Sequence, residues 1–138
     1  MINAISRKLY ELFKIDNIYS DSVEQGLNEP CFFIKEINSE VKDYRAERKR
    51  VRKSYCITYL SDKDRFDGLD DELIEFGEKL LLNFEIIEDL EGNKYRAIDR
   101  EIEIVDSQLN FYFKVDVMYL RKEESEKMEV LIQKCVAR

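Results

Sequence analysis

The segment from Leu109 to Arg121 constrains the fold of this chain more than any other. It reads LNFYFKVDVMYLR, in which apolar or aromatic side chains alternate with mostly polar ones. A period of two places the first set on one face of a β-strand and the second set on the other. An apolar strand face must be covered by another layer of the protein. We therefore expect this strand to be central in a sheet, with its apolar face against helices.

Two segments have the pattern of the covering helices. Residues 2–13 and residues 69–84 carry apolar side chains at steps of three and four, which is typical of one helix face. Asn3 is placed to cap the first helix, and Asp67 or Asp70 to cap the second. Gly77, inside the second helix, marks a point where another element packs closely.

The remaining ordered segments read mainly as strands. They are rich in β-branched and aromatic residues and comprise residues 16–21, 31–37, 51–59, 84–90 and 94–106. Glu91-Gly92-Asn93 and Ser107-Gln108 suit tight hairpin turns. The C-terminal segment fits both periodicities, and we favour a strand or an extended arm. The order of elements predicts an α+β fold: a mainly antiparallel sheet with two helices packed on one face.

Length and composition favour one domain. The chain has 138 residues with only four Gly and one Pro, which leaves little material for linkers. We expect a single domain over residues 1–122, followed by a C-terminal arm or strand over residues 123–138. The N-terminus lacks the apolar stretch of a signal peptide, and no apolar run approaches the length of a membrane span. These features predict a protein that is cytosolic, or becomes part of something assembled in the cytosol, and does not enter the membrane.

The residue types needed for common enzyme chemistry are largely missing. The chain contains no His, which is the usual general base and the commonest metal ligand. It has no glycine-rich phosphate-binding motif, and its three Cys form no C-x-x-C pair. The carboxylates of Asp99, Glu101 and Glu103 alternate with isoleucines, as on a solvated strand face. We therefore expect a protein that is not an enzyme and that uses no cofactor.

The acidic loop around residues 62–73 does not have the pattern of a calcium site. A calcium-binding loop needs oxygen ligands at positions 1, 3 and 5, Gly at position 6 and Glu at position 12. Counted from Asp62, position 5 holds Phe66, position 6 holds Asp67 and position 12 holds Leu73. The pattern fails at all three, so the sequence predicts a solvated loop before a helix and no metal.

A basic band interrupts this acidic chain. Residues 41–55, VKDYRAERKRVRKSY, hold seven of the 23 basic residues and are locally +5, while the whole chain is −7. The band suits an exposed loop and strand end, where charge protects an edge strand. It also suits a surface that binds an acidic patch, such as residues 62–75 with net −5, on another copy. Binding to nucleic acid is the third interpretation.

The N-terminal part resembles a known family. The segments MINAISRKLYELF, IYSDSVEQGLNEPCFFIKEI and SYCITYL are similar to those of the small tail terminator-like proteins of tailed phages and prophages of Firmicutes. The similarity is strongest over residues 1–60 and continues through the helix at 69–84 and the strand LNFYFKVDVMYLRK. The basic band is richer here than in the family pattern, so its role is not carried over.

The resemblance implies a structural function. Such proteins cap the head-proximal end of a tail tube as a ring, usually of six copies, and so stop polymerisation and offer a joining surface for the head. Related proteins occur in prophages with contractile tails and in phage-tail-like bacteriocins, where the ring also touches the sheath. The implied partners are further copies, the tail tube protein, the sheath protein and the head–tail connector, with DNA only as cargo. Assembly would take place in the host cytoplasm, and the ring would end in the virion or tail-like particle.

Three groups of residues are candidates for contact with another subunit or with the tail tube. They are the basic band (Arg45, Arg48, Lys49, Arg50, Arg52, Lys53), an acidic group (Asp62, Asp64, Asp67, Asp70, Asp71) and a loop (Glu24, Gln25, Gly26, Leu27). The alternative function is a small nucleic-acid-associated or regulatory binding module that uses residues 42–53.

Overall fold

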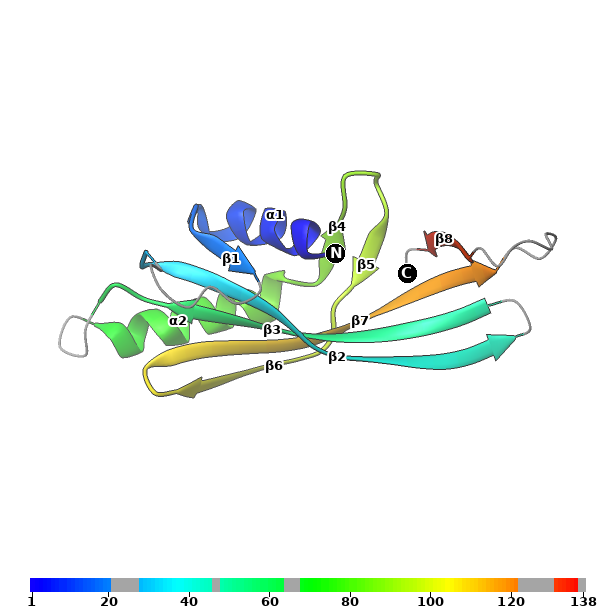
Figure 1. Ribbon diagram of the computed structural model, residues 1–138. Helices are drawn as coiled ribbons and strands as arrows, with labels where there is room; N and C mark the ends of the chain where they lie inside the picture. Colours follow the sequence, from blue (N-terminus) through cyan, green and yellow to red (C-terminus); the bar gives the residue numbers. More distant parts are fainter. Residues whose placement is uncertain (21–27, 46–47, 64–67, 122–130, 137–138) are drawn as a thin grey trace.

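The computed structural model describes residues 1–20, 28–45, 48–63, 68–121 and 131–136 (Figure 1). Within them, the helices are α1 (Ile2–Phe13) and α2 (Leu69–Asn83). The strands are β1 (Ile18–Ser20), β2 (Cys31–Arg45), β3 (Arg48–Leu60), β4 (Ile86–Glu88), β5 (Lys94–Arg96), β6 (Ile98–Val105), β7 (Gln108–Arg121) and β8 (Leu131–Val136). The expected α+β class is confirmed.

The main sheet has the strand order β1-β2-β3-β7-β6, and β8 also pairs with β7. Neighbouring strands are antiparallel except β1 and β2, which are parallel. β4 and β5 form a separate hairpin. The central position predicted for the strand at residues 109–121 is confirmed, because β7 lies between β3 on one side and β6 and β8 on the other.

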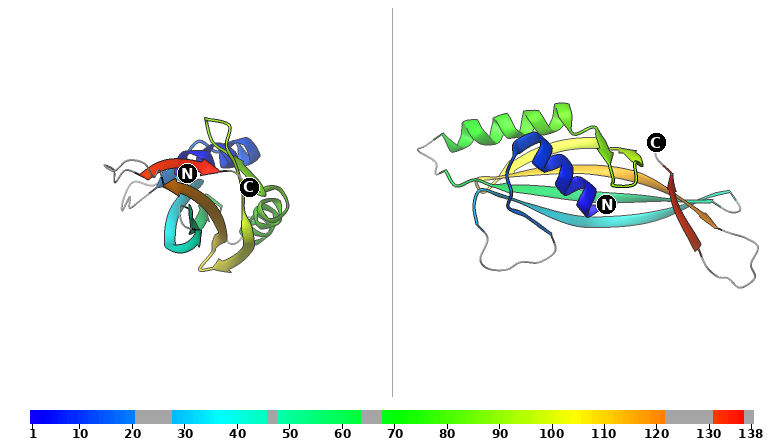
Figure 2. Two further views of the ribbon diagram at one scale, coloured as in Figure 1. Left: turned by 90° about the vertical axis from the view of Figure 1, so that its right-hand side faces the viewer. Right: turned by 90° about the horizontal axis from the view of Figure 1, so that it is seen from above.

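Both helices lie over one face of the main sheet (Figures 1 and 2). Alternate side chains of β3 and β7, such as Ile57 and Phe111, are buried beneath them. Phe76 of α2 stacks on Phe13 of α1 with ring centroids 4.5 Å apart, and it also contacts Tyr59 of β3 at 4.4 Å. These aromatic contacts join both helices to the sheet in one core.

The close approach predicted at Gly77 is confirmed. A Cβ atom added there would lie 2.7 Å from Ile102 Cδ1 and 3.3 Å from Leu109 Cδ1. Only Gly lets α2 come this close to β6 and β7 without moving those side chains.

The predicted helix caps were wrong where the structure describes them. α1 is preceded by Met1 at the N-cap position, and no side chain bonds its free N–H groups. α2 is preceded by Gly68, whose φ of 87° lies in the left-handed region. Asp70 instead lies in the first turn of α2, where a carboxylate suits the helix dipole. Asp67 lies outside the described residues.

The predicted strand at residues 94–106 is divided between two sheets. β5 pairs with β4, whereas β6 pairs with β7. Between them, the N–H of buried Ala97 donates to the carbonyl of Glu85 at 2.9 Å. The following turn is centred on Asp106 and Ser107, both with positive φ, one residue earlier than expected.

The longest strands extend beyond the helices as an arm, made of residues 38–45 of β2, 48–54 of β3 and 114–121 of β7 (Figure 1). The sheet bends where this arm begins. β2 has a register shift between Glu36 and Asn38, and β6 has one between Ile98 and Glu101. Both shifts flank the paired residues Tyr55 and Phe113 of the two central strands, whose own register is continuous.

Candidate interaction surfaces

The basic band lies on the arm. Arg45 and Arg48 are register partners at its end, and the other candidate cations lie along β3. β3 pairs with β2 on one side and with β7 on the other. The part of the band on β3 is therefore not an edge strand, whereas its residues 41–45 lie on β2, where the described residues pair only with β3. The edge-strand interpretation is wrong for β3 and agrees with the position of residues 41–45. The polar residues of the band occupy both strand faces, so they leave no apolar alternation to mark the strand.

The band is divided between the two faces of the sheet. Tyr55 and Ile57 are buried toward the helices, so the alternation along β3 places Lys49 and Lys53 on that same side. Arg50 and Arg52 lie on the opposite side, here called the outer face. Lys49 is exposed, whereas Lys53 is half-buried.

On the outer face, Arg52 is held by Asp116 of β7. Its Nε donates to Oδ1 at 2.8 Å and its Nη2 donates to Oδ2 at 3.0 Å. The hydrogen bond to Asp116 raises the pKa of Arg52 above its ordinary value. Arg50 Nη1 lies 4.0 Å from Asp116 Oδ2. Part of the band thus stabilises its own sheet.

The acidic candidates lie at the other end of the molecule. Asp62 follows β3, and Asp70 and Asp71 lie in the first turn of α2; all three are exposed. Nearby, Ser61 Oγ donates to Glu72, whose Oε2 lies 3.7 Å from Lys63 Nζ. Figure 1 shows the arm and the start of α2 at opposite ends, so these groups do not meet within one chain.

The other candidates cannot be placed. Asp64, Asp67 and the loop residues Glu24, Gln25, Gly26 and Leu27 lie outside the described residues. Their proposed contacts remain predictions.

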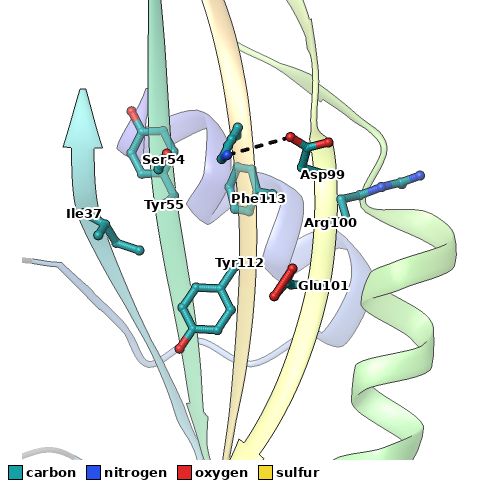
Figure 3. A pocket seen from close by; sticks show the side chains of 9 residues that line it. Ile37, Ser54, Tyr55, Asp99, Arg100, Glu101, Tyr112 and Phe113 are labelled. Atoms are coloured by element: carbon teal, nitrogen blue, oxygen red, sulfur yellow. Dashed lines mark ion pairs between the residues drawn. The ribbon is translucent and has the colours of Figure 1, made fainter. Parts of the chain in front are cut away.

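The sequence did not predict a hollow of about 510 Å³ on the outer face, at the bend of the sheet (Figure 3). Lys114 Nζ lies 3.8 Å from Asp99 Oδ2 on its rim, and Glu101 lines it beside Tyr112. Tyr112 donates to Glu103 Oε1 at 3.4 Å. The alternating carboxylates were visible in the sequence, but only the two aligned register shifts bring them to the edge of a concavity.

Polar side chains also lie on the outer face between β3 and β7. Thr58 Oγ1 donates to Asn110 Oδ1 at 2.8 Å, and Cys56 Sγ lies 3.9 Å from the same oxygen. Burial raises the pKa of the Cys56 thiol, which keeps it protonated and weakly nucleophilic at neutral pH. Within the described ranges, no group of three or more Cys, Asp or Glu side chains could hold a metal ion. This surface offers hydrogen bonds and charge to a partner.

These features define an α+β protein with a two-helix core, an uncovered polar sheet face and a charged arm. The family model for the phage tail terminator protein matches residues 1–127, and the chain belongs to this family. A search of the curated proteins finds no match. In the part of the chain that the structure describes, no helix has both the length and the apolar character needed to cross a bilayer.

Membership of this family establishes a structural role in the phage tail. The protein takes part in virion assembly and interacts with other tail proteins.

Proposed function

We propose that this chain caps the head-proximal end of a tail tube as a ring, with six copies as the expected number. The ring occupies the last tube layer, stops polymerisation, and offers its other side to the head–tail connector or, in a contractile tail, to the sheath. Family membership supports the tail role. The observation that supports a ring is the separation of opposite charges between the arm and the start of α2, which lie at opposite ends of the molecule (Figure 1).

Opposite charges at opposite ends favour contacts between unlike surfaces. The arm carries Lys49, Arg50 and Arg52, whereas the far end carries Asp62, Asp70 and Asp71. A twofold axis can pair these unlike ends only reciprocally, in a closed antiparallel dimer, whereas a contact that repeats in one direction adds further copies. A head-to-tail arrangement pairs the arm of one copy with an acidic surface of the next, and such an arrangement closes into a ring when the rotation permits.

The net charge also suits a ring through which DNA passes. At −7, the chain repels phosphate overall, so DNA can move as cargo without being held. We infer that the ring assembles in the host cytoplasm and remains in the virion, or in a tail-like particle when the source is a prophage or a bacteriocin cluster.

The direct test removes this chain from assembling particles. We expect electron micrographs to show overlong tubes without heads, because nothing ends tube growth. Tails of normal length, joined to heads, would contradict the capping function.

A second test addresses the arm. The double variant Lys49→Glu, Lys53→Glu should reduce the fraction of capped tails in complementation, while Lys94→Glu on β5, also exposed, serves as the matched control. Equal capping by both variants would exclude these lysines from the contact. A salt-sensitive shift of duplex DNA by the wild-type chain, lost in the double variant, would instead favour the nucleic-acid function.

A further inference from the structure

The main sheet has two edges that no described strand covers. β1 pairs with β2 only at residues 32–34, so β2 from Lys35 onward pairs on one side only among the described residues. β6 likewise pairs only with β7 within these ranges. An open strand edge presents backbone donors and acceptors to another strand.

Backbone directions identify the groups at these edges. The N–H of Phe32 donates to the Asn17 carbonyl at 3.0 Å, so it points away from β3. The N–H groups of successive residues point to opposite sides of a strand. The pairing registers of β2 with β3, β3 with β7 and β7 with β6 then give the direction of each N–H group on the later strands. The outward N–H groups are then those of Ser39 and Val41 on β2, and of Ile102 and Ile104 on β6.

The two edges differ in charge. Residues 35–54, which contain the β2 edge and the strand behind it, hold eight basic and four acidic residues. Residues 98–105 of β6 hold three acidic residues and one basic residue, and Asp99, Glu101 and Glu103 are exposed. Two β6 edges would repel each other, as would two arms. A β6 edge and an arm attract.

The strand directions suit the same contact. β2 and β6 run in opposite directions, because each neighbour from β2 through β3 and β7 to β6 is antiparallel. Copies related by rotation about a ring axis keep their strand directions when the strands run nearly parallel to that axis. The β2 edge of one copy would therefore meet the β6 edge of the next as an antiparallel pair.

The β2 and β6 edges are offset along the strand direction, and the size of this offset is compatible with a sheet that closes into a ring. The open edge of β6 lies opposite residues 108–114 of β7. The open edge of β2, followed through β3, is level with residues 112–120 of β7. The midpoints differ by about five residues, or roughly 16 Å, over the four strand spacings from one β2 edge to that of the next copy, which amount to about 19 Å. This offset corresponds to a strand tilt of about 40°, which is within the range of closed sheets.

From these observations, we propose that the β2 edge at residues 38–42 of one copy adds to the β6 edge of a second copy. The main sheet then continues from subunit to subunit, with the carboxylates of β6 facing the cations of the neighbouring arm. This inference rests on the proposed function, because it requires that copies associate head to tail. It specifies which strands form the joint.

Hydrogen exchange of the full chain tests the joint directly. Amide exchange is compared between dilute free chains and assembled chains, formed either at high concentration or on purified tail tubes. We expect the amides of Ser39, Val41, Ile102 and Ile104 to exchange at least about tenfold more slowly in the assembly, because they become hydrogen-bonded. The exposed amide of Leu90, in the separate β4–β5 hairpin, serves as an internal reference.

Two variants test the edges separately. Val41→Pro removes one outward donor and leaves the pairing of β2 with β3 intact, while Val41→Thr keeps the donor. Glu101→Lys with Glu103→Lys reverses the charge of the β6 edge, and Glu85→Lys with Glu88→Lys makes the same change at exposed sites near β4. We expect Val41→Pro, and the double variant Glu101→Lys with Glu103→Lys, to weaken association at least about tenfold, and the two controls to leave it unchanged. Circular dichroism confirms that each variant folds.

The outcomes separate this inference from the proposed function. Slower exchange at both edges, with loss of assembly in the two edge variants, supports the joint. Assembly without slower exchange at these amides overturns the joint and leaves the ring intact. If the folded wild-type chain does not associate alone at concentrations near about 1 mM, and does not associate on tubes, both proposals are wrong.

Discussion

The ion pair between Arg52 and Asp116 should stabilise the arm far more than a second ion pair on the same strand. Both pairs cross between β7 and a neighbouring strand on the outer face. Arg52 and Asp116 form two hydrogen bonds, of 2.8 and 3.0 Å, with side chains 29% and 17% exposed. Lys114 and Asp99 approach only to 3.8 Å and are 42% and 63% exposed. The comparison tests whether burial and geometry determine the strength of these contacts.

The expected magnitudes follow from the surroundings. Two unit charges about 4 Å apart gain about 4 kcal/mol at an effective dielectric constant near 20, and about 1 kcal/mol in water. Desolvation and lost side-chain freedom offset part of each gain. We expect a coupling energy of about 2 kcal/mol for Arg52 and Asp116, as for a charge-assisted two-bond contact. For Lys114 and Asp99, we expect at most about 0.5 kcal/mol.

Double-mutant cycles measure both coupling energies. The variants Arg52→Gln, Asp116→Asn and their combination form one cycle, and Lys114→Gln, Asp99→Asn and their combination form the control cycle. The free energy of unfolding comes from urea titration followed by circular dichroism, at a concentration where the chain is monomeric. Equal coupling energies in the two cycles, or a value below about 0.5 kcal/mol for Arg52 and Asp116, would refute the reasoning.

Three further predictions concern the core and its hairpin. Gly77→Val should lower the free energy of unfolding by about 1–3 kcal/mol in urea titration, because its side chain overlaps that of Ile102; unchanged stability would contradict the packing. Burial opposes ionisation of Asp89, but hydrogen bonds from Asn93, Glu91 and Tyr95 outweigh it and lower the pKa of Asp89. This stabilisation should be present above about pH 4 and decrease as the pH falls further, so Asp89→Ala should flatten the acid side of the stability profile. Burial, followed by the charge of Glu72, raises the pKa of Tyr59; stability should therefore decrease above about pH 10, and absorbance at alkaline pH should show Tyr59 ionising only as the chain unfolds.

The sequence predicted the elements that have one apolar face. β7 and α2 were placed within a residue or two, because the periodicity of their buried side chains is uninterrupted. The close packing at Gly77 was also predicted, since a glycine weakens a helix interior unless a neighbouring element needs the space that a side chain would fill.

The β2 part of the arm could not be predicted in the same way. Glu40 and Val41 are both exposed, so this part of β2 has no buried face and no apolar period. Its strand conformation depends on pairing with β3, which is a long-range contact. The hollow at the bend also depends on long-range pairing, because two register shifts far apart in sequence must align on the same part of the central strands.

β3 and β7 pass through the bend without interruption, and this has a consequence for quality control during assembly. The arm and the aromatic core share the same two strands, so we expect them to unfold as one cooperative unit. A subunit that is misfolded in its core therefore also lacks the arm that its neighbours recognise. A partner that binds the folded arm should therefore raise the melting temperature of the entire subunit. Only correctly folded copies would then be incorporated into the ring.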